Sequence, residues 1–134
     1  MKKILLFLLV MFILTTCFSY TLGIKGSLIN PGFQGFEMAI KVTEVFNNSL
    51  ADAFLRTNDL IIAVSSISSW GPANQSSSRR SVEGSYINNT ASYKSSAITG
   101  VDYFKNTISS LNDSSAVLNF LIYRNGRYIE YTVF

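Results

Sequence analysis

Residues 55–64 read LRTNDLIIAV, a polar turn followed by an apolar run of strand length. Asn58 and Asp59 are turn-forming residues, because their short side chains hydrogen-bond to the nearby backbone. The apolar run at 60–64 is typical of a strand that is covered on both faces. We therefore expect a turn at 58–59 that leads into a buried central strand, and the other elements are placed around it.

Upstream of this strand, the sequence predicts a second strand and a short helix. Apolar and polar residues alternate over 38–45, as in a strand with one buried face. Ser49 and Asp52 have the spacing of a capping box in which Asp takes the place of Glu. A short helix is therefore expected to begin at Ser49 and to end before the turn at 58–59.

The stretch that follows the central strand has a different composition. Twelve of the 34 residues at 65–98 are serine, and a Gly-Pro pair interrupts the stretch. Such a composition predicts one long loop, which is either a solvated insertion or a binding lid. The aromatic side chains of Trp70, Tyr86 and Tyr93 are the observation that favours a lid, because exposed aromatic residues often mark contact surfaces.

A second helix is predicted after this loop. Thr99 is expected to be its N-cap, with Asp102 in the first turn. Apolar residues then fall on a single helical face, at Val101, Phe104, Ile108 and Leu111. The helix should therefore pack one side against the rest of the domain.

The C-terminal part of the sequence predicts a β-hairpin. Asn125-Gly126 separates two runs rich in β-branched and aromatic residues, and this pair favours a type I′ turn. The expected fold is a small α+β domain with five to six strands and two helices, and the serine-rich insertion precedes the second helix. A chain of 134 residues suits one domain, which we expect over 20–134.

The composition excludes several classes of active site. The sequence contains no histidine and one cysteine, so Ser-His-Asp and Cys-His systems, imidazole or paired-thiolate zinc sites and an internal disulfide are ruled out. The carboxylates form no acid–base pair and no calcium loop, and there is no glycine-rich phosphate loop. We therefore expect a protein that is not an enzyme and that uses neither a metal nor a cofactor.

The charge of the chain gives little reason to expect a nucleic-acid partner. Eleven basic residues stand against eight acidic ones, and two of the basic residues are the lysines of the N-terminal segment. The pair Arg79-Arg80 is too short for a nucleic-acid patch. No nucleic acid is therefore expected among the partners.

The N-terminus has the pattern of a secretory signal peptide. Two lysines precede an apolar run at 4–14, and small residues near the end of the segment suit cleavage before Tyr20. This pattern predicts a signal peptide over 1–19 and a domain that is exported to the periplasm or secreted.

Two other fates of this segment stay open. The phrase LTTC at 14–17 is similar to a lipobox, in which Cys17 would carry a lipid anchor to the envelope, although Thr16 stands where a smaller residue is usual. An uncleaved membrane anchor is the third alternative, because no charge occurs between Ile4 and Ile24, but 15–20 is polar. All three alternatives place the domain outside the cytoplasm.

The order of these elements, together with four local phrases, resembles a PDZ domain of the bacterial, circularly permuted type. TLGI at 21–24 is similar to the carboxylate-binding loop of that family, and VTEVFNNSLA at 42–51 to its run from a strand into a short helix. LRTNDLIIAV at 55–64 resembles Leu-x-x-Gly-Asp-x-Ile-x-x-Val, with Asn58 in place of glycine. FLIYRNGRYIEYTV at 120–133 resembles the terminal hairpin. The resemblance implies a PDZ-like, partly open β-barrel or sandwich.

The resemblance also implies a binding site for a peptide. Such domains bind the C-terminal tail, or an extended segment, of a partner protein as an added strand at a sheet edge. The edge would run over 22–28, with Leu22, Gly23, Ile24, Lys25 and Gly26 along the ligand. A second candidate for the carboxylate loop, GFQGF at 32–36, is more simply explained as a hairpin tip.

The other wall of the implied site would be the second helix. Its pocket residues would be Val101, Phe104 and Ile108, for which plain core packing has the same periodicity. With no histidine to accept a ligand hydroxyl, apolar side chains of the ligand are expected to be preferred.

Three hypotheses for function follow from this resemblance. The first is an exported, non-catalytic module that binds peptide tails. The alternatives are a regulatory or remnant part of an exported serine protease system and a structural component of an envelope or secretion assembly.

Overall fold

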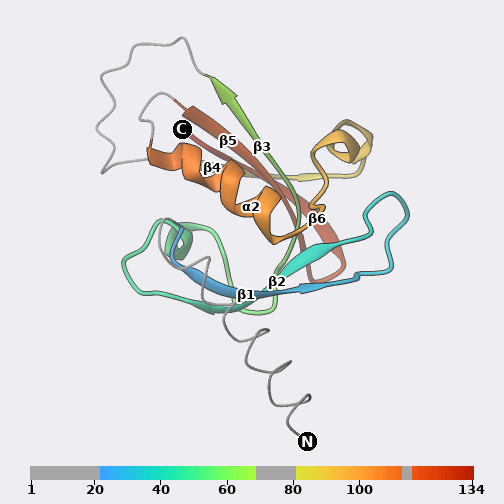
Figure 1. The fold of residues 1–134 in the computed structure, drawn as a ribbon, viewed down its shortest axis with the longest axis horizontal. Coiled ribbons are helices and arrows are strands. Elements are labelled where there is room, and N and C mark those ends of the chain that lie inside the picture. Colours follow the sequence, from blue (N-terminus) through green and yellow to red (C-terminus); the bar gives the residue numbers. More distant parts are fainter. Residues whose placement is uncertain (1–21, 69–80, 113–115) are drawn as a thin grey trace, which may run out of the picture.

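The computed structural model describes residues 22–68, 81–112 and 116–134, and these form a small α+β domain (Figure 1). In chain order the elements are β1 (Ile24–Ile29), β2 (Ala39–Val45), the 3₁₀ helix η1 (Ala51–Ala53), β3 (Leu60–Ser68), β4 (Val82–Ile87), the 3₁₀ helix η2 (Ala91–Ser96), the α-helix α2 (Val101–Ile108), the 3₁₀ helix η3 (Ser109–Asn112), β5 (Ala116–Arg124) and β6 (Arg127–Val133). The α+β class predicted from the sequence is confirmed. The signal peptide expected at 1–19, Cys17 and Trp70 lie outside the described residues.

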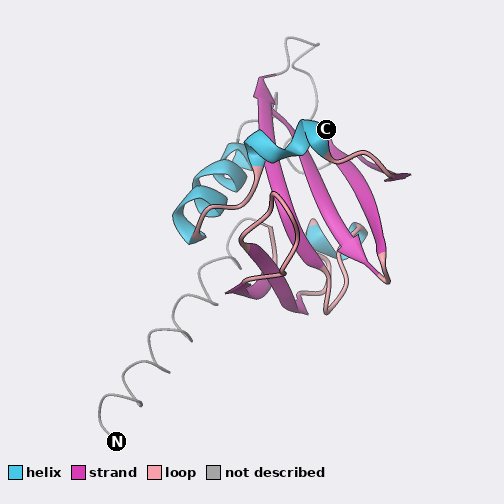
Figure 2. Cartoon of the chain, turned by 90° about the vertical axis from the view of Figure 1, so that its right-hand side faces the viewer, coloured by secondary structure: helices cyan, strands magenta, loops and turns pink. Residues whose placement is uncertain are grey.

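The six strands form one antiparallel sheet in the order β1-β2-β3-β5-β6-β4. Its long strands stand side by side with a clear twist (Figure 2). The order places β1 at one edge of the sheet and β4 at the other. Each edge strand pairs with a single neighbour among the described strands, and the two edges are the positions where a further strand or ligand can be added.

The central strand β3 is covered on both faces, as its continuous apolar run predicts. Ile61 and Val64 belong to the larger core cluster, which also holds Phe104 of α2. Ile62 and Ala63 belong to a second cluster on the other face, together with Phe36 and Tyr93. A register shift between Ile61 and Ala63 accompanies this change of face.

The predicted turns adopt the expected backbone conformations. Asn58 has a φ of 77°, a left-handed conformation that Asn tolerates better than most residues. Asn125 and Gly126 have φ values of 52° and 78°, as a type I′ turn requires, and β5 pairs with β6 directly across them. The C-terminal hairpin is thus confirmed.

The short helix after β2 is held by the side chains that predicted it. Asp52 donates its backbone N–H to the Oγ of Ser49 at 3.3 Å, and its own carboxylate accepts the N–H of Asn48 at 3.2 Å. These bonds resemble a capping box, but the helix is a single 3₁₀ turn, η1, whose N-cap position is Leu50 and carries no side-chain cap. The predicted start at Ser49 and the predicted length are therefore wrong.

The expectation of one continuous loop over 65–98 is wrong. β3 extends to Ser68, β4 occupies Val82–Ile87, and η2 occupies Ala91–Ser96. β4 is stabilised by its pairing with β6, from Val82 opposite Val133 to Ile87 opposite Tyr128. Because the paired residues of β6 lie 41 to 51 positions later in the sequence, local composition gave no signal for this strand.

The second helix forms, but not with the predicted boundaries. α2 begins at Val101 after Gly100, and no side chain caps its first turn, so Thr99 is not the N-cap. The α-helix ends at Ile108 and tightens into η3. The predicted apolar face is present, because Phe104 and Ile108 are buried and Val101 is half-buried.

Candidate functional site

The strand β1 offers a free backbone edge. Phe46 donates its N–H to the carbonyl of Gly23 at 2.9 Å, which makes these two residues a hydrogen-bonded pair. Since hydrogen-bonded and non-hydrogen-bonded pairs alternate in an antiparallel ladder, the N–H and C=O of Ile24, opposite Val45, point away from β2. The first residue of β1 therefore presents its backbone groups to the outer side of the sheet.

The turn that leads into β1 has its carbonyls engaged. Ala51 donates its N–H to the carbonyl of Leu22 at 3.0 Å, and the carbonyl of Gly23 accepts the N–H of Phe46 at 2.9 Å. The Ser49 hydroxyl donates to the carbonyl of Phe46 at 2.7 Å and lies 3.4 Å from that of Gly23. The N–H of Gly23, in contrast, finds no acceptor among the residues that the structure describes. A free amide beside an outward-facing one is the arrangement that binds a carboxylate.

Gly23 is required at this turn for two separate reasons. Its φ of +92° lies in the region that favours glycine. A Cβ at this position would lie 2.1 Å from the Cβ of Ser49, so any side chain would push the turn away from η1. The close approach of the two backbones therefore depends on this residue.

The predicted site residues are brought together, but most of them are core residues. Leu22, Ile24, Phe104 and Ile108 belong to one buried cluster, and Val101 packs against it while keeping some exposure. Phe104 is 0% exposed and Ile108 3% exposed. The spacing of Phe104 and Ile108 fits both a pocket wall and core packing, and in the structure these side chains pack in the core. Val101 is the predicted α2 residue that keeps exposed surface.

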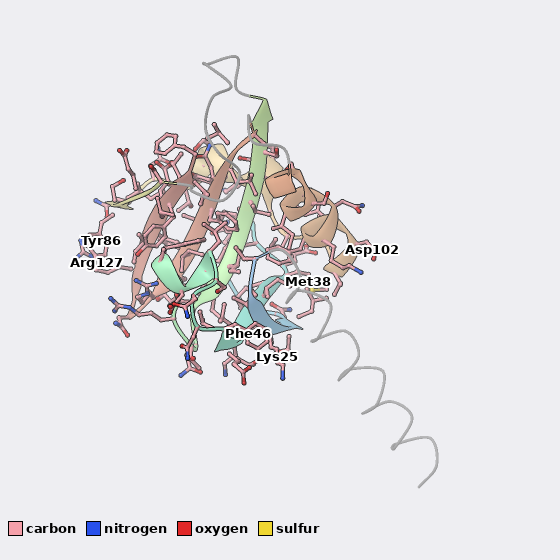
Figure 3. The ribbon with its side chains drawn as sticks, turned by 90° about the vertical axis from the view of Figure 1, so that its left-hand side faces the viewer. Lys25, Met38, Phe46, Tyr86, Asp102 and Arg127 are labelled. Carbon is pink, nitrogen blue, oxygen red and sulfur yellow. The ribbon has the colours of Figure 1, made fainter. Side chains whose placement is uncertain are left out.

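Lys25 and Gly26 lie farther along β1. The Lys25 ammonium is 3.9 Å from the carboxylate of Glu44 and 5.8 Å from the centroid of the Phe46 ring, near which it is labelled in Figure 3. A solvent-exposed pair of this kind contributes little to stability. Gly26 is buried, and a Cβ there would lie 2.7 Å from the Ile40 side chain and 2.9 Å from the carbonyl oxygen of Lys41. β1 therefore lies unusually close to β2 at Gly26.

The alternative loop at 32–36 forms a hairpin tip, as expected. The N–H of Phe36 donates to the carbonyl of Phe33 at 3.2 Å, and the Phe36 ring is buried in the second core cluster. The Phe33 carbonyl and the Phe36 ring therefore already have partners within the domain.

A buried ion pair between Asp59 and Arg124 was not predicted from the sequence. The guanidinium of Arg124 donates to both carboxylate oxygens of Asp59, at 2.8 and 2.6 Å, and to the carbonyl of Phe54 at 2.7 Å. The hydrogen bonds to Asp59 raise the pKa of Arg124 above its ordinary value, against the opposing effect of burial. Asp59 and Arg124 each lie in a phrase that resembles the PDZ family. Their occurrence in these phrases was the available sequence signal that they pair.

The described residues contain no group of three His, Cys, Asp or Glu side chains that could hold a metal ion. Within the same ranges, no helix is long and apolar enough to cross a membrane. Comparison with known proteins found no family model, no curated protein and no solved structure that matches the chain. The features of the described residues that bear on function are therefore the two edges of the sheet.

Proposed function

We propose that the protein is an exported, PDZ-like binding module that takes the C-terminal tail of a partner protein as an added strand on β1. The observation that carries this proposal is the glycine turn at the start of an edge strand. Its carbonyls are engaged by η1 and Phe46, whereas the Gly23 N–H is free among the described residues. Main-chain donors left over at an edge strand are what β-augmentation needs.

The carboxylate of the tail would bind at Gly23 and Ile24. Both amides lie at the start of β1, and a charged acceptor strengthens such hydrogen bonds about twofold relative to a neutral one. The preceding residues of the tail would then run along β1 and pair with its outward-facing backbone groups, the first of which belong to Ile24.

The side chains of the tail would meet a shallow apolar surface. Because Phe104 and Ile108 are buried, selectivity for the ligand would come from the margin of the cluster, where Val101 is half-buried. We therefore propose recognition that is dominated by the main chain, with a modest preference for apolar side chains.

The test uses the purified chain and a library of peptides with randomised, free C-termini. Enriched peptides are resynthesised as the free acid and as the C-terminal amide. We expect amidation to weaken binding roughly tenfold or more, because it removes the charge from the acceptor of two amide hydrogen bonds. Chemical-shift perturbations in NMR spectra should be centred on Gly23, Ile24 and the rest of β1.

A matched pair of variants on α2 sharpens this test. Val101→Glu and Asn106→Glu introduce the same charge into the same helix, but Val101 packs against the β1 cluster and Asn106 is exposed. The first should weaken binding of the acid peptide at least tenfold, and the second less than twofold. Equal affinity for acid and amide, or a perturbation map centred on β4, would contradict the proposal.

We also propose that the domain works outside the cytoplasm. The intact mass of the protein recovered from exported fractions tests this directly. A mass that matches 20–134 supports cleavage before Tyr20, and an acylated chain beginning at Cys17 supports a lipid anchor. A full-length, cytoplasmic chain would contradict export.

A further inference from the structure

A second candidate site lies at the opposite edge of the sheet. A hollow of about 350 Å³ is lined by Arg56, Arg124 and Arg127 together with Tyr86, Ile129 and Tyr131. A smaller hollow of about 290 Å³ adjoins it and shares Arg56, Arg124 and Tyr131. In Figure 3 the labels of Tyr86 and Arg127 lie on the side away from Asp102 of α2, so this region is separate from the β1 edge.

Arg127 is held in place by a ring contact that leaves its positive charge unneutralised. Its guanidinium carbon lies 3.6 Å from the centroid of the Tyr86 ring, in a stacked position. Stacking holds the guanidinium plane and leaves its N–H edges available for an anion. No ion pair joins Arg127 to an acidic residue in the described parts of the chain. Tyr86, the stacking partner, is 59% exposed, so the pair faces solvent.

Arg56 is the second available cation of the hollow. Its backbone N–H is fixed by the Asp59 carboxylate at 2.8 Å, while its side chain is exposed and lines both hollows. Like Arg127, it forms no ion pair with a described acidic residue. Two guanidinium groups without an ion-pair partner therefore line the larger hollow, while the carboxylate of Asp52 lines the smaller, adjoining one.

Arg124 differs from Arg56 and Arg127, because its charge is matched by the Asp59 carboxylate, whose Oδ2 lies 2.6 Å from Nη2 of Arg124. It also donates from Nη1 to the hydroxyl oxygen of Tyr131 at 3.0 Å. Since that oxygen accepts this bond, the Tyr131 hydroxyl proton remains free to be donated into the hollow. Gly84 leaves room for the Tyr131 ring, whose Cε1 lies 2.4 Å from where a Cβ would be.

We propose that this hollow binds a phosphate group, as the monoester of a small organic molecule. Two unpaired guanidiniums and one hydroxyl donor match the three terminal oxygens and the double charge of a phosphate monoester better than the two oxygens of a carboxylate. The exposed Tyr86 ring offers apolar surface to the organic part, and Ile129, which is 5% exposed, adds little. The volume lies at the lower end of the range of small-ligand sites.

The test measures binding of phenyl phosphate and of benzoate to the purified chain by calorimetric titration at low ionic strength. We expect phenyl phosphate to bind at least tenfold more tightly than benzoate. Arg56→Gln and Arg127→Gln should each weaken phenyl phosphate binding about tenfold. The matched control is Lys105→Gln, which removes the same charge from an exposed position on α2 and should change the affinity less than twofold.

A lipid headgroup carries the same phosphate chemistry, and a second arm separates the two sources. Vesicles of phosphatidylcholine with and without phosphatidic acid are sedimented with the chain. Binding to phosphatidic acid vesicles that is lost in both arginine variants, with weak binding of phenyl phosphate, assigns the site to a headgroup. Binding of phenyl phosphate without vesicle binding assigns it to a soluble ester.

Two results would overturn the proposal. The first is the absence of binding in both arms by a chain that is folded by circular dichroism. The second is binding that Arg56→Gln and Arg127→Gln leave unchanged, because the ligand would then lie elsewhere. Neither result bears on peptide capture at β1, which is measured independently.

Discussion

The two edges of the sheet differ in what they leave available to a ligand. At β1 the side chain of Ile24 and the backbone at Gly26 are buried, so one face of the strand belongs to the core and the backbone edge remains for a ligand. At β4 the four residues at 83–86 are exposed, and an exposed tyrosine there stacks on an arginine. The two free edges therefore offer different surfaces. The β1 edge suits recognition through the main chain, and the β4 edge suits recognition through charged side chains.

The difference has a simple physical origin. β1 contributes Ile24 to the large core cluster that also holds Phe104 and Ile108 of α2, whereas β4 packs only Val82 against the margin of this cluster and exposes 83–86. Burial of apolar side chains stabilises an edge strand but removes those side chains from contact with a ligand. We therefore expect peptide binding at β1 to tolerate changes of sequence and phosphate binding at β4 to depend on single side chains.

The largest expected effect comes from the ion pair that supports the β4 side. Asp59→Ala leaves the guanidinium of Arg124, whose side chain is 11% exposed, without its carboxylate. We expect a loss of about 3–5 kcal/mol in the free energy of unfolding, measured with urea. In conditions where the variant stays folded, phosphate binding should strengthen, because Arg124 then adds an unmatched positive charge to the hollow, and peptide binding should persist.

The control for this prediction is the double variant Asp59→Ala with Arg124→Met. An apolar side chain removes the unpaired charge, so the double variant should regain part of the lost stability. Recovery will be incomplete, because Arg124 also bonds Phe54 and Tyr131. A double variant whose loss equals the sum of the two single losses would show that the two residues are not coupled.

A smaller effect is expected from the glycine at the β1 turn. Gly23→Ala adds both a left-handed alanine and a contact of 2.1 Å with Ser49, and we expect it to cost about 2–3 kcal/mol. Gly126→Ala is the matched control, because its φ is +78° but nothing lies within 4 Å of the added Cβ. This control should cost only about 1 kcal/mol by thermal or urea unfolding. Equal losses would mean that backbone strain alone accounts for Gly23.

Each edge strand also contains one closely packed glycine, so the same substitution at both positions compares how the two edges are packed. A Cβ at Gly26 would lie 2.9 Å from a backbone oxygen of β2, whereas a Cβ at Gly84 would meet the Tyr131 ring at 2.4 Å. A ring can rotate away and a paired backbone cannot, so Gly26→Ala should cost about 1–3 kcal/mol and Gly84→Ala less. Gly84→Ala should nevertheless weaken phosphate binding, because it displaces Tyr131. A larger loss of stability at Gly84 would reverse our view of the two edges.

Local signals in the sequence were sufficient for much of the fold. The apolar run after Asn58-Asp59 and the Asn125-Gly126 pair are short-range patterns, and the structure confirms the buried strand and the hairpin that they predict. The strand β4 could not be predicted in the same way. Its sequence, VEGSYI, has mostly exposed side chains, and it is stabilised by pairing with β6, which is its neighbour in the sheet but lies far along the chain.

The candidate sites show the same limit. Gly23 was expected in a carboxylate-binding loop from the resemblance alone, and its positive φ and its close approach to Ser49 had no separate signal in the sequence. Phe104 and Ile108, in contrast, have a spacing that fits a pocket wall and a core face equally well, and only packing distinguishes the two. The hollow at β4 combines Arg56, Tyr86 and Arg127 from three separate segments, so no single stretch of sequence contains its pattern.

The smallest expected effect concerns Tyr93, on the face of the sheet that neither site uses. Its hydroxyl donates to the Glu130 carboxylate, and burial, followed by this hydrogen bond and the charge of Glu130, raises the pKa of Tyr93 above its ordinary value of 10.0. A raised pKa in the folded state means that this contribution to stability is complete below pH 10 and is lost as the pH rises further. In Tyr93→Phe, the fall of the unfolding free energy above pH 10 should be shallower by up to about 1.4 kcal/mol per pH unit. Urea unfolding at a series of alkaline pH values measures this slope, and an unchanged slope would show that Tyr93 ionises as easily in the folded chain as in the unfolded one.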